Sequence, residues 1–215
     1  MENNGQLIIN GIKKNKIIAI IRGVKTKDLQ NLMTALYNGG INFAEITFGK
    51  KSDEEGYGDL KFAIECFGDK MFIGAGTVTS ENRMKLAQKA GCKYLISPVL
   101  NEQLIDFCKQ NGLISIIGAL SPSEIKCAYD KGASFVKVFP SNLFGAKYFK
   151  EIKAPLGEIP LIAFGGVNAQ NAKEFIDSGA VAVGIGSAIV NHELINAGDF
   201  EAITNLCKNI ISKIK

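Results

Sequence analysis

The sequence predicts an α/β fold, specifically a (β/α)8 TIM barrel with an additional N-terminal helix. Eight short apolar runs alternate with amphipathic stretches along the chain. This alternation is typical of parallel strands joined by crossover helices, and eight such units in 215 residues match a compact barrel. The alternative is a doubly wound open sheet, but that fold usually has fewer strands, and no G-x-G-x-x-G follows the first run. No linker or low-complexity segment divides the chain, so we expect residues 1–215 to form a single domain.

Each element carries its own pattern. The strands are expected near residues 17–22, 43–48, 71–77, 94–98, 113–118, 135–139, 160–165 and 181–185. The helices are expected at Gln6–Lys14 (the extra one), Lys27–Tyr37, Asp59–Phe67, Glu81–Ala90, Glu102–Gln110, Ser123–Asp130, Ala169–Asp177 and Phe200–Ile214. Ser80 precedes one helix, and residues 121–124 resemble a capping box before another. The polar stretch 49–58 is interpreted as a solvated loop, and His192 as a surface residue.

The composition restricts the chemistry. His192 is the only histidine, which disfavours a histidine-rich metal centre or a Ser-His-Asp triad, so we expect no metal. The five cysteines form no C-x-x-C pair and are interpreted as buried, reduced thiols of a cytosolic protein. A net charge of +4, spread along the chain, is too small to indicate nucleic-acid binding. With neither a signal peptide nor an apolar run of membrane-spanning length near the N-terminus, we expect a cytoplasmic protein without a membrane partner.

Three charged residues interrupt the apolar strands. Arg22 ends the first strand, Glu45 lies in the second and Lys137 in the sixth, all toward the carboxyl ends where barrel enzymes keep their active sites. Charges in strands buried on both faces are unfavourable unless they serve a purpose. A structural purpose is one alternative: an ion pair between Lys137 and Glu45, or Glu45 as an acceptor for the backbone or for Arg22. For Arg22, the sequence supports two roles equally: a ligand for an anion and a structural counter-ion.

The catalytic interpretation of Lys137 rests on its surroundings. Strand alternation places it on one face with Phe135 and Phe139, and Glu45 on one face with Thr47. Desolvation lowers the pKa of a lysine and frees a nucleophilic amine, as Schiff-base chemistry with a carbonyl substrate requires. A nearby carboxylate can then transfer protons.

Glycine-rich turns end several other strands. Loops after the last two strands of a barrel commonly bind phosphate, and glycines let backbone N–H groups approach its oxygens. Tight turns that merely favour glycine are the structural alternative. Thr77 and Pro98 end the third and fourth strands and have structural and functional interpretations of equal weight. The candidate phosphate-binding residues are Gly165, Gly166, Gly186 and Ser187.

From about Ile12 to the C-terminus, the chain resembles the class I 2-keto-3-deoxy-6-phosphogluconate (KDPG) / 4-hydroxy-2-oxoglutarate (KHG) aldolase family. The resemblance is carried by IIAIIRG, FAEITF, IGAGTVTS, LISPVLNE, FVKVFP, GGV and GIGSAIV, in that order. It implies a barrel enzyme that cleaves a 2-keto-4-hydroxy acid to pyruvate and an aldehyde, glyceraldehyde 3-phosphate or glyoxylate. It also implies a homotrimer that acts through a covalent Schiff base without a metal or other cofactor.

The resemblance also implies residue roles. Lys137 matches the Schiff-base lysine, and Glu45 matches the general acid/base, which in the family can act through a water. Thr77 matches a residue near the substrate carboxylate. The substrate-binding set is Arg22, Thr47, Thr77, Pro98, Phe139 and Phe164, and the phosphate loops are those given above.

The chain departs from the family pattern in places that concern the substrate. Many members have an arginine where this chain has Gly49, and Lys50, Lys51 and Arg22 are the candidates to replace it. Many also have a threonine where this chain has Phe164, so a hydroxyl is lost and a ring gained. Two other functions remain open: a phosphate-binding barrel isomerase or synthase, and a non-catalytic keto-acid-binding paralogue.

Overall fold

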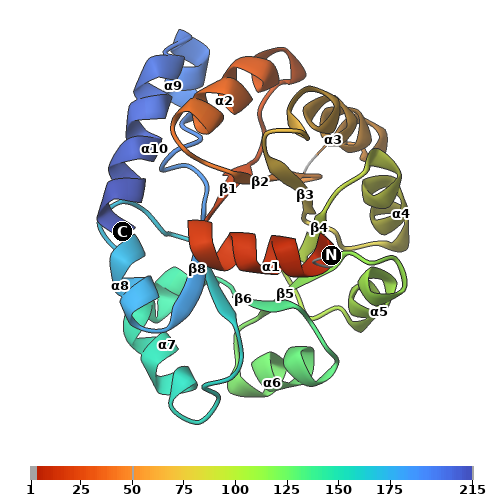
Figure 1. The fold of residues 1–215 in the computed structure, drawn as a ribbon, viewed down its shortest axis with the longest axis vertical. Coiled ribbons are helices and arrows are strands. Elements are labelled where there is room, and N and C mark those ends of the chain that lie inside the picture. Colours follow the sequence, from red (N-terminus) through yellow and green to blue (C-terminus); the bar gives the residue numbers. More distant parts are fainter. Residues whose placement is uncertain (1–3, 50, 215) are drawn as a thin grey trace.

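The computed structural model describes residues 4–49 and 51–214. Eight parallel strands form a closed barrel in sequence order, and helices surround it (Figure 1). The predicted α/β barrel is therefore confirmed. The strands are β1 (Ile17–Ile21), β2 (Phe43–Thr47), β3 (Phe72–Gly76), β4 (Tyr94–Ser97), β5 (Ile114–Ala119), β6 (Phe135–Val138), β7 (Leu161–Phe164) and β8 (Ala180–Ile185).

The helices include all those predicted and two that were not. They are α1 (Asn4–Asn15), α2 (Thr26–Asn38), α3 (Asp53–Phe67), α4 (Glu81–Ala90), α5 (Glu102–Gln110), α6 (Pro122–Asp130), α7 (Gly145–Lys153), α8 (Ala172–Asp177), α9 (His192–Ala197) and α10 (Phe200–Ile214), with a 3-10 turn, η1, at Ser141–Leu143. The unpredicted helices are α7 and α9. No side-chain cap marks the start of α7, and α9 is only six residues long.

The interpretation of residues 49–58 as a solvated loop is wrong from Asp53 onward, because α3 begins there. Ser52 caps the helix: its hydroxyl accepts from the Glu55 N–H at 3.2 Å, and the Glu55 carboxylate accepts from the Ser52 N–H at 3.0 Å. Asp53 is also bound, accepting from Arg83 Nε at 2.7 Å. Gly56 faces Phe48 so closely that a Cβ would lie 2.4 Å from the ring. The glycine is therefore a packing contact inside a helix, not a loop signal.

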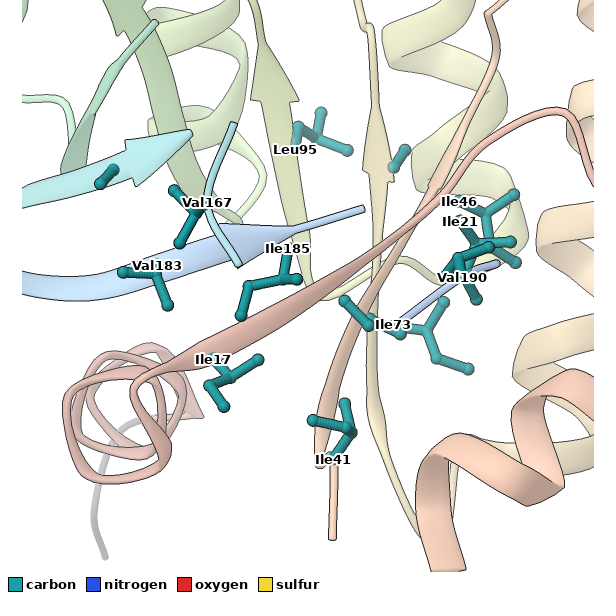
Figure 2. Close-up of a cluster of buried hydrophobic side chains, with 14 of the residues drawn as sticks. Ile17, Ile21, Ile41, Ile46, Ile73, Leu95, Val167, Val183, Ile185 and Val190 are labelled. Carbon is teal, nitrogen blue, oxygen red and sulfur yellow. The ribbon is translucent and has the colours of Figure 1, made fainter. Parts of the chain in front are cut away.

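Strand side chains alternate between two apolar clusters. Those pointing outward form the larger cluster together with apolar side chains of the helices. Figure 2 draws Ile17, Ile21, Ile46, Ile73 and Val183 from this cluster. Burial of both strand faces explains why the strands read as continuous apolar runs.

The inward-pointing side chains fill the barrel, and α1 closes its amino end. Helix α1 crosses the barrel (Figure 1) and leads almost directly into β1, so it covers the amino ends of the strands. Its Ile8 and Ile12 join the same inner cluster as Ile18 and Phe43. Gly11 lets α1 approach closely, since a Cβ there would lie 2.6 Å from Phe43 Cζ. Among residues 4–49 and 51–214, the carboxyl ends are therefore the side of the barrel left open to a ligand.

Other expectations are met in part. All five cysteines are free. Cys92, Cys108 and Cys207 are buried as expected, whereas Cys66 is exposed and Cys127 half-buried, because both face outward on helices. Across the part of the chain that the structure describes, no helix has the length and apolarity to span a membrane.

Candidate active site

A cavity of about 600 Å³ opens at the carboxyl end of the barrel, between β1, β6, β7 and β8. Eight of the residues singled out in the sequence line it: Arg22, Lys137, Phe139, Phe164, Gly165, Gly166, Gly186 and Ser187. Glu45, Thr47, Thr77 and Pro98 do not line this cavity, although all four lie in or just after strands β2, β3 and β4 of the same barrel end.

Lys137 lies in the barrel interior with its side chain 4% exposed. Its amine lies over two aromatic rings, 4.5 Å from the Phe164 centroid and 5.0 Å from the Phe139 centroid. Burial lowers the pKa of this amine; the Glu45 carboxylate opposes that shift and Arg22 adds to it. Lys137 and Glu45 do not form an ion pair within the described residues, so the structural alternative of a buried pair is not supported.

Glu45 is 1% exposed and lies against β3. Gly76 makes room for it, because a Cβ at that position would lie 2.8 Å from the Glu45 Cδ and Oε1 atoms. Burial raises the pKa of this carboxyl, while Lys137 and Arg22 act to lower it. Oε2 is buried with no hydrogen-bond partner among the described residues. The environments push the amine and the carboxyl toward their neutral forms, as acid/base chemistry near neutral pH requires.

Aromatic side chains form the floor of the site. Phe43 and Phe72 stack at 4.9 Å, and Tyr94 leans against Phe43. The Tyr94 hydroxyl donates to the Ala44 carbonyl at 2.7 Å, and burial raises the pKa of this phenol. Gly74 leaves space for the Tyr94 ring. This floor separates Glu45 from the amino end of the barrel and keeps its surroundings apolar.

Three other predicted residues differ in environment. Thr47 is buried on the same face as Glu45, and its hydroxyl has no partner in the described part of the chain. Thr77 has a φ of 59°, a strained conformation for a β-branched residue. Its carbonyl accepts from Arg83 Nη1 at 3.1 Å, which holds that conformation in place. Pro98 packs its carbonyl against Gly118 of β5, a structural contact.

The mouth of the cavity suits an anion. Gly165 and Gly166 have φ values of 94° and 72°, which only glycine adopts readily. The Asn171 amide donates to the Gly166 carbonyl at 3.0 Å and fixes this loop. In the described structure, the N–H groups of Gly166, Ser187 and Ala188 donate no hydrogen bond within the protein. They therefore remain available to a ligand.

Two residues at the mouth of the cavity were not among the functional candidates expected from the sequence. His192 is exposed, as expected for a surface residue, but it lines the cavity and faces Gly23 beside Arg22. Asn168, after β7, lines the cavity as well. No carboxylate is found among the described residues of the lining, so the mouth favours anions. A signal existed for Asn168, which lies two residues after Gly166 in the same glycine-rich turn, but none existed for His192.

The missing arginine at Gly49 is not replaced by Lys51. The Lys51 amine binds Asp59 and donates to the Val24 carbonyl at 2.7 Å, away from the cavity. Lys50 lies outside the described residues. Arg22 lies one residue beyond β1, is exposed and lines the cavity, so of the two described candidates it is the one at the cavity.

Comparisons with known proteins identify the family of the chain. The family model for KDPG and KHG aldolase matches residues 8–206. The chain is 33% identical to a 2-dehydro-3-deoxy-phosphogluconate aldolase of Pseudoalteromonas atlantica, over 84% of this chain and 83% of the relative. It is 30% identical to the 2-dehydro-3-deoxy-6-phosphogalactonate aldolase of Escherichia coli, over 81% and 84%.

A solved structure shows the same arrangement of elements. It is the KDPG aldolase of Legionella pneumophila, with pyruvate captured as a covalent carbinolamine intermediate. The TM-score is 0.86 at 27% identity, covering 96% of this chain and 97% of the other. From the family match and these relatives, the chain belongs to the KDPG and KHG aldolase family of lyases.

Proposed function

We propose that the protein cleaves a 2-keto-4-hydroxy acid to pyruvate and an aldehyde through a Schiff base on Lys137. The observation that carries this proposal is the amine itself, buried at the carboxyl end of the barrel between two phenylalanine rings. Burial favours the neutral, nucleophilic amine. Glu45 is the general acid/base, since its raised pKa lets it hold or release a proton.

The reaction proceeds in balanced steps. The Lys137 nitrogen attacks the C2 carbonyl and forms a carbinolamine, which loses water with a proton supplied by Glu45 to give a cationic iminium. Glu45, now a carboxylate, takes the proton of the C4 hydroxyl. The C3–C4 bond breaks, its electrons flow into the iminium, and the aldehyde leaves. Glu45 then protonates C3 of the neutral enamine, and hydrolysis releases pyruvate. The lysine is the electron sink, so the proposed mechanism requires neither cofactor nor metal.

The mouth of the cavity favours a substrate with a terminal anionic group. Arg22, Ser187 and the N–H groups of the Gly165-Gly166 loop surround the space above Lys137. We propose 2-keto-3-deoxy-6-phosphogluconate as the substrate, with its phosphate in these loops and glyceraldehyde 3-phosphate as the aldehyde product. 4-Hydroxy-2-oxoglutarate, which yields glyoxylate, is the smaller candidate. Thr47, Thr77, Pro98, Phe139 and Phe164 are the proposed remaining substrate contacts.

We further propose a cytoplasmic homotrimer. Large apolar side chains stand exposed on loops after β4 and β6, which flank β5 at the carboxyl end: Val99 is 54% exposed, Leu143 63% and Phe144 57%. Exposed apolar clusters on a protein surface commonly mark interaction sites. Sedimentation of the wild type and of Phe144→Glu tests the assembly. A wild type that sediments as a monomer would contradict it.

Two assays test the activity. A coupled assay for pyruvate release, run over phosphorylated and unphosphorylated 2-keto-4-hydroxy acids, identifies the substrate. Borohydride reduction with pyruvate, followed by peptide mapping, locates the Schiff base. We expect one adduct, on Lys137, and none in Lys137→Met. An adduct elsewhere, or full activity in Lys137→Met, would rule out the assigned lysine. Release of pyruvate only from unphosphorylated acids would rule out the phosphate site.

A further inference from the structure

The Lys137 amine lies over two aromatic faces. Its Nζ lies 4.5 Å from the ring centroid of Phe164 and 5.0 Å from that of Phe139. No hydrogen bond or ion pair joins the amine to another residue in the described structure. A cation within about 6 Å of a ring centroid is attracted by the ring quadrupole, whereas a neutral amine is not attracted in this way.

The Phe164 ring is fixed by both neighbouring strands. On β8, a Cβ at Gly184 would lie 2.3 Å from Phe164 Cε1, so the ring occupies space that only a glycine leaves free. After β6, the Ser141 hydroxyl accepts from the Phe164 N–H at 3.1 Å and donates to the Val138 carbonyl at 2.8 Å. The ring is 1% exposed. The packing on Gly184, the burial of the ring and the anchored backbone together hold the ring face over the amine.

We propose that Phe164, with Phe139, stabilises the cationic iminium on Lys137 through a cation–π interaction. This inference rests on the proposed Schiff-base function and assigns a specific step to the ring. The neutral amine gains nothing from the two faces, whereas the iminium, formed when the carbinolamine loses water, carries its positive charge between them. An interaction present only in the charged species favours its formation. Desolvation by the apolar walls strengthens the attraction.

The inference separates two steps of the cycle. Cleavage of the C3–C4 bond turns the iminium into a neutral enamine, so the rings promote dehydration and not scission. The population of Schiff base formed with pyruvate alone is therefore the direct readout, because that equilibrium involves no carbon–carbon cleavage.

Fluorinated phenylalanines at position 164 provide the test. One, two or three ring fluorines progressively remove negative charge from the π face while changing the ring's size little. The protein is mixed with subsaturating pyruvate at alkaline pH and reduced with borohydride, and the modified fraction is measured by intact mass. We expect this fraction to fall stepwise, which corresponds to a roughly three- to tenfold decrease across the series in the equilibrium constant for Schiff-base formation. The matched control is the same series at Phe175 of α8, a buried ring that packs on Phe149 at 5.3 Å and should leave trapping unchanged.

A pH profile supplies a signature that packing alone does not produce. The charged groups that act on the amine are Glu45 on β2 and Arg22 after β1. At acid pH the free lysine is itself a cation, so the rings act on both states and the effect of fluorination shrinks. At alkaline pH the free amine is neutral and the full effect remains.

The outcomes are distinguishable. Equal trapping across the Phe164 series at alkaline pH, in folded protein, would overturn the inference and leave the ring as an apolar wall. Absence of any adduct in the wild type would instead overturn the proposed function. If the fluorinated variants fail to fold, Phe164→Leu replaces them, since it keeps apolar contact but lacks a π face, and the same loss of trapping is expected.

Discussion

Gly76 controls where the carboxyl of Glu45 lies, and replacing it with alanine is a sensitive test of the proposed acid/base. The added Cβ would lie 2.8 Å from Cδ and Oε1 of Glu45, whereas carbon atoms pack at about 3.5–4.0 Å. The carboxyl must therefore move by about 1 Å. A displacement of that size costs a reaction about 10²-fold in rate, and a general acid/base contributes about 10²–10⁴-fold in all.

Stability is expected to change much less than turnover. The clash is with the end of a flexible side chain, so overpacking costs no more than about 1–3 kcal/mol, and loss of glycine freedom in the unfolded chain offsets up to about 1 kcal/mol. We expect Gly76→Ala to fold and to melt within several degrees of the wild type, while kcat in the pyruvate-release assay falls about 100-fold.

A matched glycine provides the control. Gly58 lies within α3, where a Cβ would meet nothing within 4 Å. Gly58→Ala should leave kcat unchanged and raise stability by up to about 1 kcal/mol. Folded Gly76→Ala with wild-type kcat would refute the reasoning, because the carboxyl would then be displaced without consequence.

Three further predictions follow from the same geometry. Burial raises the pKa of Glu45 above its ordinary value, so the stabilising contribution of the protonated carboxyl is present at acid pH and lost as pH rises through the raised pKa. The Tm of Glu45→Gln should therefore exceed that of the wild type by a margin that grows as pH rises. A pH-independent difference in Tm would contradict this. Gly184→Ala places a Cβ within 2.3 Å of the Phe164 ring and should lower the free energy of unfolding by about 1–3 kcal/mol in urea melts. The loss should be smaller in a Phe164→Leu background. An equal loss in both backgrounds would exclude that contact as the cause. His192→Ala should raise KM for the phosphorylated substrate about tenfold, by loss of one hydrogen bond to a charged group, with kcat and the KM of unphosphorylated acids unchanged; a uniform rise for all substrates would place the histidine elsewhere in the reaction.

The sequence was informative wherever the strand period decides which way a side chain points. Alternation grouped Glu45 with Thr47 and Lys137 with its two phenylalanines on single strand faces, and the position of both charges within the strands placed them toward the carboxyl end. The structure shows that both side chains are buried. Charged residues are rare in apolar strands, so a few of them sufficed to locate the proposed site.

Other features depend on contacts between distant segments and left no local signal. His192 reaches the cavity only because α9 begins beside the loop after β1. The contact between Phe164 and Gly184 joins two neighbouring strands, β7 and β8, and nothing in the sequence distinguishes Gly184 from other strand glycines. The early start of α3 was missed because Gly56 and Gly58 lie near its beginning, although the acidic first turn and the capping box of Ser52 and Glu55 are both helix-start signals.

Closure of the amino end by α1 has a kinetic consequence. With Ile8 and Ile12 packed into the inner cluster, the described residues leave the site open at the carboxyl end of the barrel, where both products of the proposed cleavage would leave. In the proposed reaction, the aldehyde would form on the side of the opening, while pyruvate would stay covalently attached to Lys137 beneath it. Release is therefore ordered, with the aldehyde first. In steady-state product inhibition, pyruvate should compete with the substrate for the free enzyme, whereas the aldehyde should inhibit noncompetitively.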